Sequence, residues 1–188
     1  MSTWNFRTSL AARKWNDLHS VLTNEHGFAE KPALIGLSCG GLYCYQWAIE
    51  NPQKVACLYG DAPVSDMRSW PRGKGDGFDS PDDWKKLMKV FGFASEAEAI
   101  AYNGNPIDNL TSLVENHVPI LHVYGDVDDV VLWKENTGVL AERYRQMGGD
   151  ITLIGKPGCD HHPHGLSDPA LVVDFILKHT VLNRLDKV

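Results

Sequence analysis

Hydrophobic positions recur along the chain in two spacings, which predict helices and strands in alternation. The first helical face consists of Ala11, Trp15, Leu18 and Leu22. Their spacing of four, three and four residues predicts an amphipathic helix over 9–24. Short apolar runs bounded by turn residues are typical of buried strands. Four such runs occur, at residues 33–37, 55–59, 119–124 and 151–154.

Helices are predicted between and after these strands. They span residues 42–50, 81–90, 96–102, 133–147 and 169 to about 182. Ser95 and Glu98 form a capping box for the helix at 96–102, and Ser167 is the expected cap of the last helix. In the helix at 133–147, Leu140, Tyr144 and Met147 are expected to face inward.

The alternation of strands and helices predicts an α/β fold. It favours a mostly parallel sheet of about four strands with right-handed crossovers, between layers of helices. The 188 residues are 43% hydrophobic, enough for one domain over 1–188 with a core of its own. Residues 61–117 are less regular and are expected to be a cap-like insertion between two strands. They include a glycine-rich stretch at 71–77 that predicts a mobile loop.

Composition and charge narrow the classes of function. The net charge of −6 disfavours binding to nucleic acid. No apolar run is long enough to cross a membrane, and the first ten residues do not form a secretory signal, so the compartment stays open. The four cysteines are scattered and lack a Cys-x-x-Cys pair for zinc. No metal and no cofactor is expected. We expect free thiols, with a disulfide between Cys39 and Cys159 as the alternative.

Polar side chains with catalytic chemistry follow the predicted strands. They are Ser38 after the first strand, Asp61 after the second, Asp126, Asp128 and Asp129 after the third, and His161, His162 and His164 after the fourth. The carboxyl ends of parallel strands meet at one edge of the sheet, where ligands bind. A serine hydroxyl becomes a nucleophile when an imidazole takes its proton and a carboxylate orients that imidazole. The order Ser, Asp, His therefore predicts acyl-transfer chemistry.

The stretch GLSCGG at residues 36–41 predicts a sharp turn from strand to helix that exposes Ser38. Side chains two residues to either side of the serine are expected to collide, which explains glycine at 36 and 40. The backbone N–H of Cys39, at the start of the following helix, is the expected donor to a developing oxyanion.

These motifs resemble those of the α/β-hydrolase superfamily, and the likeness extends over residues 31–178. The Gly-x-Ser-x-Gly at 36–40 is similar to its nucleophile elbow, the run 125–128 with Val131 to its acid loop, and 158–161 to its histidine loop. The resemblance implies Ser38 as nucleophile, Asp128 as acid and His161 as base. A finer likeness, at 60–64 and 161–166, is to the esterase and prolyl-oligopeptidase-like branch, including bacterial carbohydrate esterases.

Several assignments stay open at this stage. Asp126, Asp129 and Asp61 compete with Asp128 for the acid role, and His164 competes with His161 for the base. His162 and His164 are alternatively residues that shape the loop.

The candidate substrate-binding residues are Trp70, Asp61, Glu135 and His164. Trp70 is equally a core residue of the cap. Glu135, which like Asn136 follows the acid loop, is alternatively an acid favoured by a helix N-terminus.

The chain departs from the superfamily before residue 33. One helix precedes the first strand, where the superfamily has several strands and a loop that donates the second oxyanion N–H. The strand at 33–37 is therefore expected to be an edge with unpaired backbone groups. A fragment of a longer enzyme, pairing of two copies through this edge, and a second chain that supplies the missing half all explain this. We expect the first, with dimerisation through the edge as its consequence.

The sequence thus predicts a serine hydrolase that cleaves carboxylic esters of small molecules or carbohydrates. Ester cleavage is expected over peptide cleavage because the sequence has no propeller or peptide-binding domain, and a serine peptidase is the alternative. A catalytically silent binding or assembly module is the competing hypothesis, favoured by the missing oxyanion loop. A phosphate-binding role for GLSCGG is disfavoured because it lacks the lysine of a P-loop.

Overall fold

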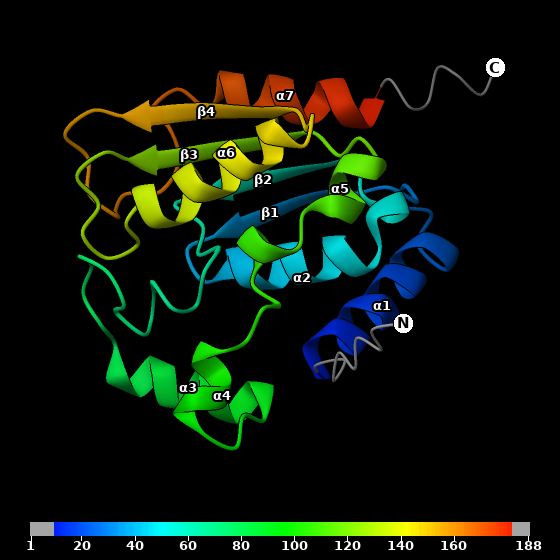
Figure 1. Cartoon of the computed structure of the whole chain (residues 1–188). Helices are drawn as coiled ribbons and strands as arrows, with labels where there is room; N and C mark the ends of the chain where they lie inside the picture. Colours follow the sequence, from blue (N-terminus) through cyan, green and yellow to red (C-terminus); the bar gives the residue numbers. More distant parts are fainter. Residues whose placement is uncertain (1–9, 182–188) are drawn as a thin grey trace.

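A computed structural model describes residues 10–181 and contains one parallel sheet (Figure 1). Its strands are β1 (Ala33–Leu37), β2 (Cys57–Asp61), β3 (Ile120–Gly125) and β4 (Ile151–Lys156). They lie in the order β1-β2-β3-β4, and each neighbouring pair is parallel. The carboxyl ends of all four strands therefore lie at the same edge of the sheet.

Helices cover both faces of this sheet. The helices of the described chain are α1 (Leu10–Asn24), α2 (Gly40–Glu50), α3 (Pro81–Phe91), α4 (Glu96–Ile100), α5 (Thr111–Glu115), α6 (Val139–Gln146) and α7 (Ala170–Val181), with turns η1 (Pro52–Lys54), η2 (Pro106–Asp108) and η3 (Lys134–Gly138). Side chains of α2, α5 and α6 pack together on one face, and α7 packs on the other. The sheet thus lies between two helical layers, and α1 packs against α2.

The pleat of the central strands divides the core between these faces. Leu58 and Ile120 point toward α2 and α6, whereas their chain neighbours Tyr59 and Leu121 point toward α7. All four side chains are buried. Since neighbouring side chains in a strand point to opposite faces, a run that is apolar throughout suits a strand covered on both sides.

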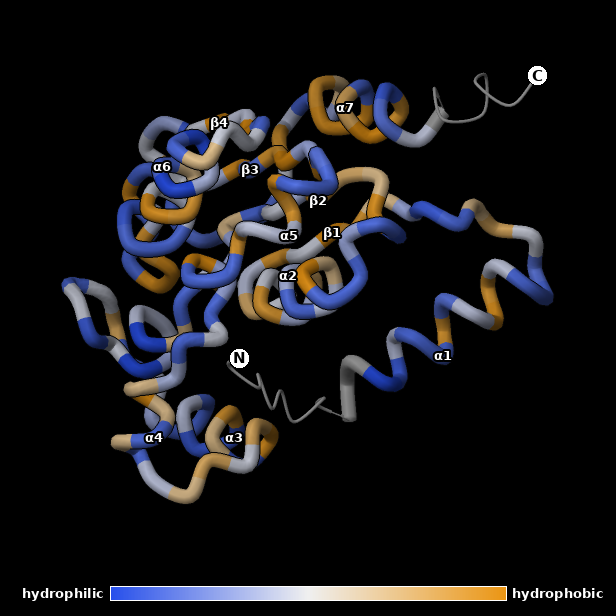
Figure 2. Tube along the Cα trace, turned by 45° about the vertical axis from the view of Figure 1, so that its right-hand side comes forward, coloured by the Kyte–Doolittle hydropathy of each residue, from blue (hydrophilic) through white to orange (hydrophobic). Residues whose placement is uncertain are grey.

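The β1 side of the α7 face is less well covered. Ile35 is 52% exposed and Leu37 is 43% exposed on β1, and Leu171 and Leu177 of α7 are exposed as well. Figure 2 shows hydrophobic positions along both elements. Within residues 10–181, β1 pairs only with β2, so its outer edge is free in this part of the chain.

The segment between β2 and β3 contains a lobe formed by α3 and α4, which lies away from the sheet (Figure 1). Met67, Trp84 and Ala99 are its buried apolar residues, and Phe91, Phe93 and Tyr102 pack around them. The lobe therefore has a small core separate from the core of the sheet.

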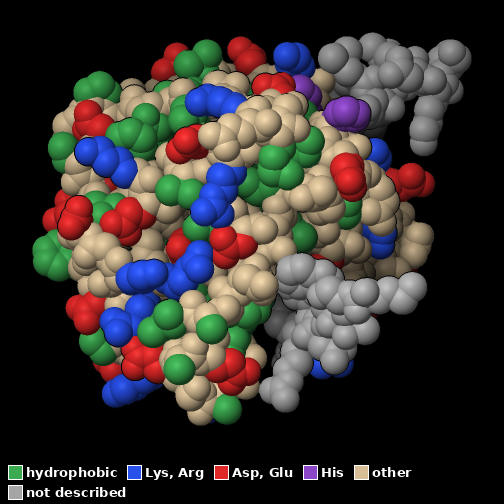
Figure 3. Space-filling view, in the orientation of Figure 1, with side chains coloured by type: hydrophobic (Ala, Val, Ile, Leu, Met, Phe, Trp, Pro, Cys, Tyr) green, Lys and Arg blue, Asp and Glu red, His purple; other side chains and the backbone are tan. Residues whose placement is uncertain are grey.

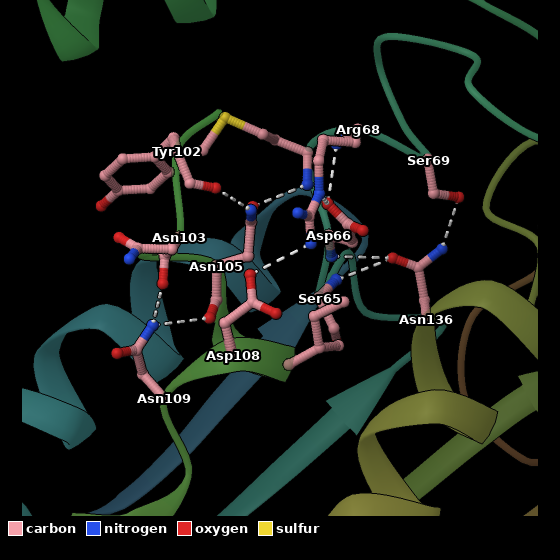
Figure 4. A network of polar contacts seen from close by, with 12 residues as sticks. Ser65, Asp66, Arg68, Ser69, Tyr102, Asn103, Asn105, Asp108, Asn109 and Asn136 are labelled. Carbon is pink, nitrogen blue, oxygen red and sulfur yellow. Dashed lines mark hydrogen bonds and ion pairs between the residues drawn. The ribbon is translucent and has the colours of Figure 1, made fainter. Parts of the chain in front are cut away.

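A polar network joins this segment to the body of the domain (Figure 4). The Asn136 side-chain oxygen accepts the backbone N–H groups of Ser65, at 2.9 Å, and Asp66, at 3.1 Å, and its amide donates to the Ser69 hydroxyl at 3.0 Å. The buried Asn105 side chain accepts the N–H of Met67 at 3.0 Å. A buried amide whose groups are all paired holds a chain segment in one arrangement.

Some predicted boundaries differ from the structure. The strand predicted at 55–59 is Cys57–Asp61, since Val55 caps the turn η1 and the strand begins two residues later. Strand β4 extends two residues further than predicted, to Lys156. The helix predicted at 133–147 begins with η3, a π-helical turn in which the Gly138 N–H donates to the Trp133 carbonyl at 2.7 Å. The short elements α5 and η2 were not predicted, since neither has a hydrophobic period long enough to detect.

Predicted inward faces were partly wrong. Leu18 is 54% exposed on α1, and Asn16 instead accepts the indole N–H of buried Trp47 at 2.9 Å. Leu140 and Tyr144 are buried as predicted, but Met147 is 42% exposed at the end of α6. Of the remaining predicted positions on α1, Trp15 packs against the core, Leu22 is half-buried, and Ala11 lies outside the described side chains.

The predicted caps had different outcomes. Ser95 accepts the Glu98 N–H at 3.2 Å, as the capping box requires, while the Glu98 carboxylate returns to the N–H of Ala94 at 2.7 Å. At the last helix, Asp168 rather than Ser167 accepts the first free N–H, from Ala170, at 3.0 Å. Pro169 lies between the two, and its fixed φ suits the first helical position.

The surface mixes both signs of charge. Figure 3 shows acidic and basic side chains interspersed over one face, without a large field of either sign. No helix among the described residues has the length and hydropathy needed to cross a membrane.

Candidate active site

The backbone of Ser38 is held in a sharp turn between β1 and α2. Its φ is 50°, in the left-handed region that residues other than glycine rarely adopt. The Ser38 N–H donates to the Asp61 carbonyl at 2.9 Å, and its carbonyl accepts the Val64 N–H at 2.9 Å and the Gly41 N–H at 3.0 Å. The turn after β1 is thus fixed by the end of β2.

The glycines of the turn do not all have the predicted reason. A Cβ on Gly36 would lie 3.0 Å from the Gly40 carbonyl oxygen, so crowding explains glycine there. A Cβ on Gly40 would meet nothing within 4 Å, so the predicted collision at that position was wrong. The crowded residue is Gly41, where a Cβ would lie 2.7 Å from the Pro63 side chain. The first turn of α2 therefore packs directly against the residues that follow β2.

Ser38, His161 and Asp128 form one hydrogen-bonded chain. The Ser38 Oγ lies 2.9 Å from His161 Nε2, and His161 Nδ1 lies 2.7 Å from Asp128 Oδ2. His161 and Asp128 are buried, whereas Ser38 is half-exposed. The carboxylate can accept only from an Nδ1–H, which leaves a lone pair on Nε2 to accept the serine proton.

The hydrogen bonds of Asp128 distinguish it from the nearby Asp126 and Asp129. Its second oxygen accepts the backbone N–H groups of Val130 and Val131, both at 2.9 Å, so the carboxylate has a fixed orientation. Asp126 and Asp129 are exposed, and Asp126 instead accepts the Gly158 N–H at 2.7 Å. Among the three aspartates after β3, Asp128 is therefore the one that contacts His161.

A second aspartate and histidine pair lies beside the first. Asp61, at the end of β2, is buried, and His164 Nδ1 lies 3.2 Å from its Oδ1. The other oxygen of Asp61 accepts the Tyr59 hydroxyl, at 2.6 Å, and the backbone N–H of Gly165. The sequence analysis assigned no role to Tyr59, which lies two residues before Asp61 on the same strand and therefore on the same face of it. Asp61 thus ties the histidine loop to the sheet.

The backbone N–H of Cys39 is available at the start of α2. Within the described part of the chain it donates to no protein acceptor, and it follows Ser38 directly. An N–H at a helix N-terminus favours negative charge near it. All four cysteines are free thiols, Cys39 exposed and Cys159 half-exposed, so the structure has no disulfide between the two loops.

Two candidate substrate-binding residues are engaged within the protein. Trp70 packs against Leu42, Val64 and Val131, as a core residue of the cap does. Glu135 accepts the N–H of Asp76 at 3.1 Å, so it holds the glycine-rich loop. These contacts account for both residues without a ligand.

The other fully buried histidine contacts neither carboxylate. His122, on β3, lies 2.8 Å from the Tyr45 hydroxyl through Nε2 and 3.1 Å from the Thr137 hydroxyl through Nδ1. Burial lowers the pKa of His122 to about 3, and the charge of Asp61 only partly opposes this. His122 is therefore neutral at neutral pH and links α2 to η3.

The three histidines of the loop after β4 lie together. One ligand nitrogen from each of His161, His162 and His164 lies within 4.8 Å of the others. The ring centroid of His161 lies 4.9 Å from that of His162 and 5.1 Å from that of His164. His162 is exposed and has no hydrogen bond to other described side chains, whereas His164 is half-buried.

Comparison with solved structures gives the fold a wider context. The chain aligns with a puromycin-hydrolyzing peptidase from Mycobacterium tuberculosis at a TM-score of 0.67 and 18% identity, over 89% of this chain and 24% of that one. It aligns with a monoacylglycerol lipase from Paleococcus ferrophilus at a TM-score of 0.56 and 18% identity, over 90% of this chain and 75% of the lipase. The chain has the α/β-hydrolase fold.

A third similar structure is the acylaminoacyl peptidase of Pyrococcus horikoshii, at a TM-score of 0.58 and 12% identity, over 79% of this chain and 23% of that one. The chain therefore spans about a quarter of the length of these two peptidases. No protein-family profile and no curated protein sequence matches the chain.

Proposed function

We propose that the protein is a serine hydrolase that cleaves carboxylic esters through an acyl-enzyme. The observation that carries the proposal is the chain of hydrogen bonds from Ser38 through His161 to Asp128, of 2.9 and 2.7 Å. Its fold is shared with peptidases and a lipase, which is consistent with hydrolysis. A nucleophile, a base and an orienting acid in contact are what acyl transfer requires.

The first half of the reaction forms the acyl-enzyme. His161 Nε2 takes the proton of the Ser38 hydroxyl as Oγ attacks the carbonyl carbon, and the carbonyl π electrons move onto oxygen. The tetrahedral intermediate then collapses, the bond to the alcohol oxygen breaks, and the leaving alkoxide takes the proton from Nε2. Asp128 stabilises the imidazolium between these steps without itself taking the proton.

The second half returns the enzyme to its resting state. A water molecule gives its proton to His161 Nε2 and attacks the acyl carbon. Collapse of the second intermediate breaks the bond to Oγ, releases the acid and returns the proton to Ser38. The backbone N–H of Cys39 donates to the oxyanion in both intermediates, and the loss of such a donor typically costs about 10²–10³ in rate.

The chemistry of the site favours an ester over an amide. An alkoxide leaves a tetrahedral intermediate more readily than an amine does, so an ester needs less stabilisation of the oxyanion. Cys39 is the donor that the elbow supplies, and it suits the less demanding substrate. Esters of small alcohols or of carbohydrates are the substrate class we propose, and peptides are the alternative.

The direct test is labelling of Ser38 with a fluorophosphonate, together with turnover of p-nitrophenyl acetate. We expect the probe to modify Ser38, and Ser38→Ala to lose labelling and to lower kcat by about 10⁴–10⁶. Ser20→Ala is the matched control, because Ser20 is exposed on α1 and has no histidine partner. Circular dichroism checks that both variants are folded.

Two outcomes would count against the proposal. If Ser38→Ala turns over the ester at the parental rate, Ser38 is not the nucleophile. If the folded parent neither labels nor turns over esters, the protein is a silent binding module of hydrolase fold, as the single oxyanion donor of the elbow would favour.

A further inference from the structure

The cluster of three imidazoles around His161 is more than the proposed reaction needs. Hydrolysis uses His161 alone, yet His162 and His164 place their nitrogens within 4.8 Å of it and of each other. Three imidazoles this close together are a ligand set typical of divalent zinc. Within the described residues this is the only group of such side chains close enough to hold a metal ion.

The carboxylates behind the cluster orient two of the rings for metal binding. His161 directs Nδ1 to Asp128, at 2.7 Å, and His164 directs Nδ1 to Asp61, at 3.2 Å. Metal-binding histidines commonly donate one ring N–H to a carboxylate, which fixes the tautomer and raises the basicity of the other nitrogen. In both residues Nε2 is the nitrogen left to bind a metal.

We propose that His161, His162 and His164 form a zinc site that reversibly inhibits the enzyme. Ligand nitrogens about 2.0–2.1 Å from a tetrahedral zinc lie roughly 3.4 Å apart. The three nitrogens therefore have to move closer together before they can bind one zinc ion. Rotation of the exposed His162 ring is the simplest movement that shortens these distances. Water or the Ser38 hydroxyl takes the fourth position. The site rests on the proposed function only for its inhibitory effect.

Inhibition follows from the lone pair that zinc uses. The Nε2 lone pair of His161 accepts the Ser38 proton across 2.9 Å, and the same lone pair would bind the metal. One lone pair cannot do both, so a zinc-bound His161 cannot act as base. Zinc and a reactive Ser38 are thus mutually exclusive.

The test measures binding and reactivity separately. Isothermal titration of the apo protein with Zn²⁺ is expected to give one site per chain, and Co²⁺ in its place to give the visible absorption of a tetrahedral complex. Fluorophosphonate labelling of Ser38 is expected to fall in parallel with occupancy and to return on addition of a chelator.

Matched variants identify the ligands. His162→Gln is expected to weaken zinc binding at least about tenfold, and inhibition is compared with the zinc-free rate of the same variant. His26→Gln is the control, because His26 is exposed and lies outside the cluster, and it should bind zinc as the parent does. Ser38→Ala retains all three imidazoles and should bind zinc although it is inactive.

The outcomes distinguish this inference from the proposed function. If Ser38 never labels but zinc binds the parent and not His162→Gln, the metal site stands and the hydrolase proposal fails. If zinc binds His162→Gln as tightly as the parent, or the parent shows no binding, the metal site is wrong whatever the activity. Binding that leaves Ser38 labelling unchanged would overturn the inhibitory role.

Discussion

Two buried aspartates each hold a histidine of the same loop, but only one of these histidines contacts Ser38. Asp128 and His161 lie 2.7 Å apart, and the histidine continues to Ser38 Oγ. Asp61 and His164 lie 3.2 Å apart, and the aspartate instead accepts from Tyr59 and from the backbone of Gly165. The same pair of residue types therefore carries two different tasks.

The partners of each carboxylate explain the difference. Asp128 accepts two backbone N–H groups of its own loop, which orient it toward one ring. Asp61 accepts from a strand and from the histidine loop, so it fixes where that loop lies against β2. We infer that the first pair handles the proton and the second positions the loop that carries it.

The largest effect is expected from Asp128→Asn. An asparagine amide in that place favours the wrong tautomer of His161, and such a change lowers kcat by about 10⁴ in a triad. Ester turnover with purified variants measures this, and the unfolding midpoint shows that the fold is retained. A loss smaller than tenfold would mean that Asp128 does not orient the base.

A different pattern is expected from Asp61→Asn. Because the asparagine can still accept hydrogen bonds but loses its charge, stability should fall by about 1–3 kcal/mol in urea unfolding. Turnover should fall by less than about 10²-fold, through displacement of the histidine loop. If Asp61→Asn instead matches Asp128→Asn in kcat at unchanged stability, the two tasks are assigned the wrong way round.

His122 is buried without a carboxylate partner, so it shows what the two histidines beside aspartates would lack without that charge. The pKa of His122 is about 3 in the folded protein, whereas an unfolded chain binds this proton near pH 6.5. Below that pH the unfolded state holds the extra proton, so stability is lost as pH falls from about 6.5 toward 3, by at most about 1.4 kcal/mol per unit.

Urea unfolding across this range should show a flatter pH dependence for His122→Gln, which hydrogen-bonds without titrating. Only the slopes of the unfolding free energy against pH are compared between the parent and this variant, because loss of the contacts to Tyr45 and Thr137 lowers stability at every pH. Equal slopes would show that another group is responsible.

The smallest effect is expected from Asp126→Asn. This side chain is exposed and accepts one backbone N–H, from Gly158, which an asparagine oxygen can also accept. Turnover should change by less than about threefold, since surface changes of this kind are worth little. A fall as large as that of Asp128→Asn would make Asp126 the acid.

The sequence was sufficient for the features that depend on local pattern. The strands, the turn at Ser38 and the order of Ser38, Asp128 and His161 come from short motifs and apolar runs, because such signals reflect neighbouring residues. The α/β fold with four parallel strands was predicted correctly.

What the sequence missed depends on contacts between distant segments. The requirement for glycine at 41 arises from Pro63, on another loop, so the motif alone suggested Gly40. The inward position of Asn16, which is half-buried where Leu18 is exposed, depends on a single indole N–H of Trp47 that needs an acceptor. Which aspartate holds which histidine depends on loop geometry that composition does not encode.

The position of Ser38 has a consequence for assembly. It follows the outermost of the four described strands, so a strand added in parallel along the open side of β1, about 4.8 Å away, would have its carboxyl end beside the Ser38 turn. A chain that pairs with this edge of β1 would therefore lie next to the candidate active site. Whether it is a neighbouring segment or a second molecule, it would help to shape the space around Ser38.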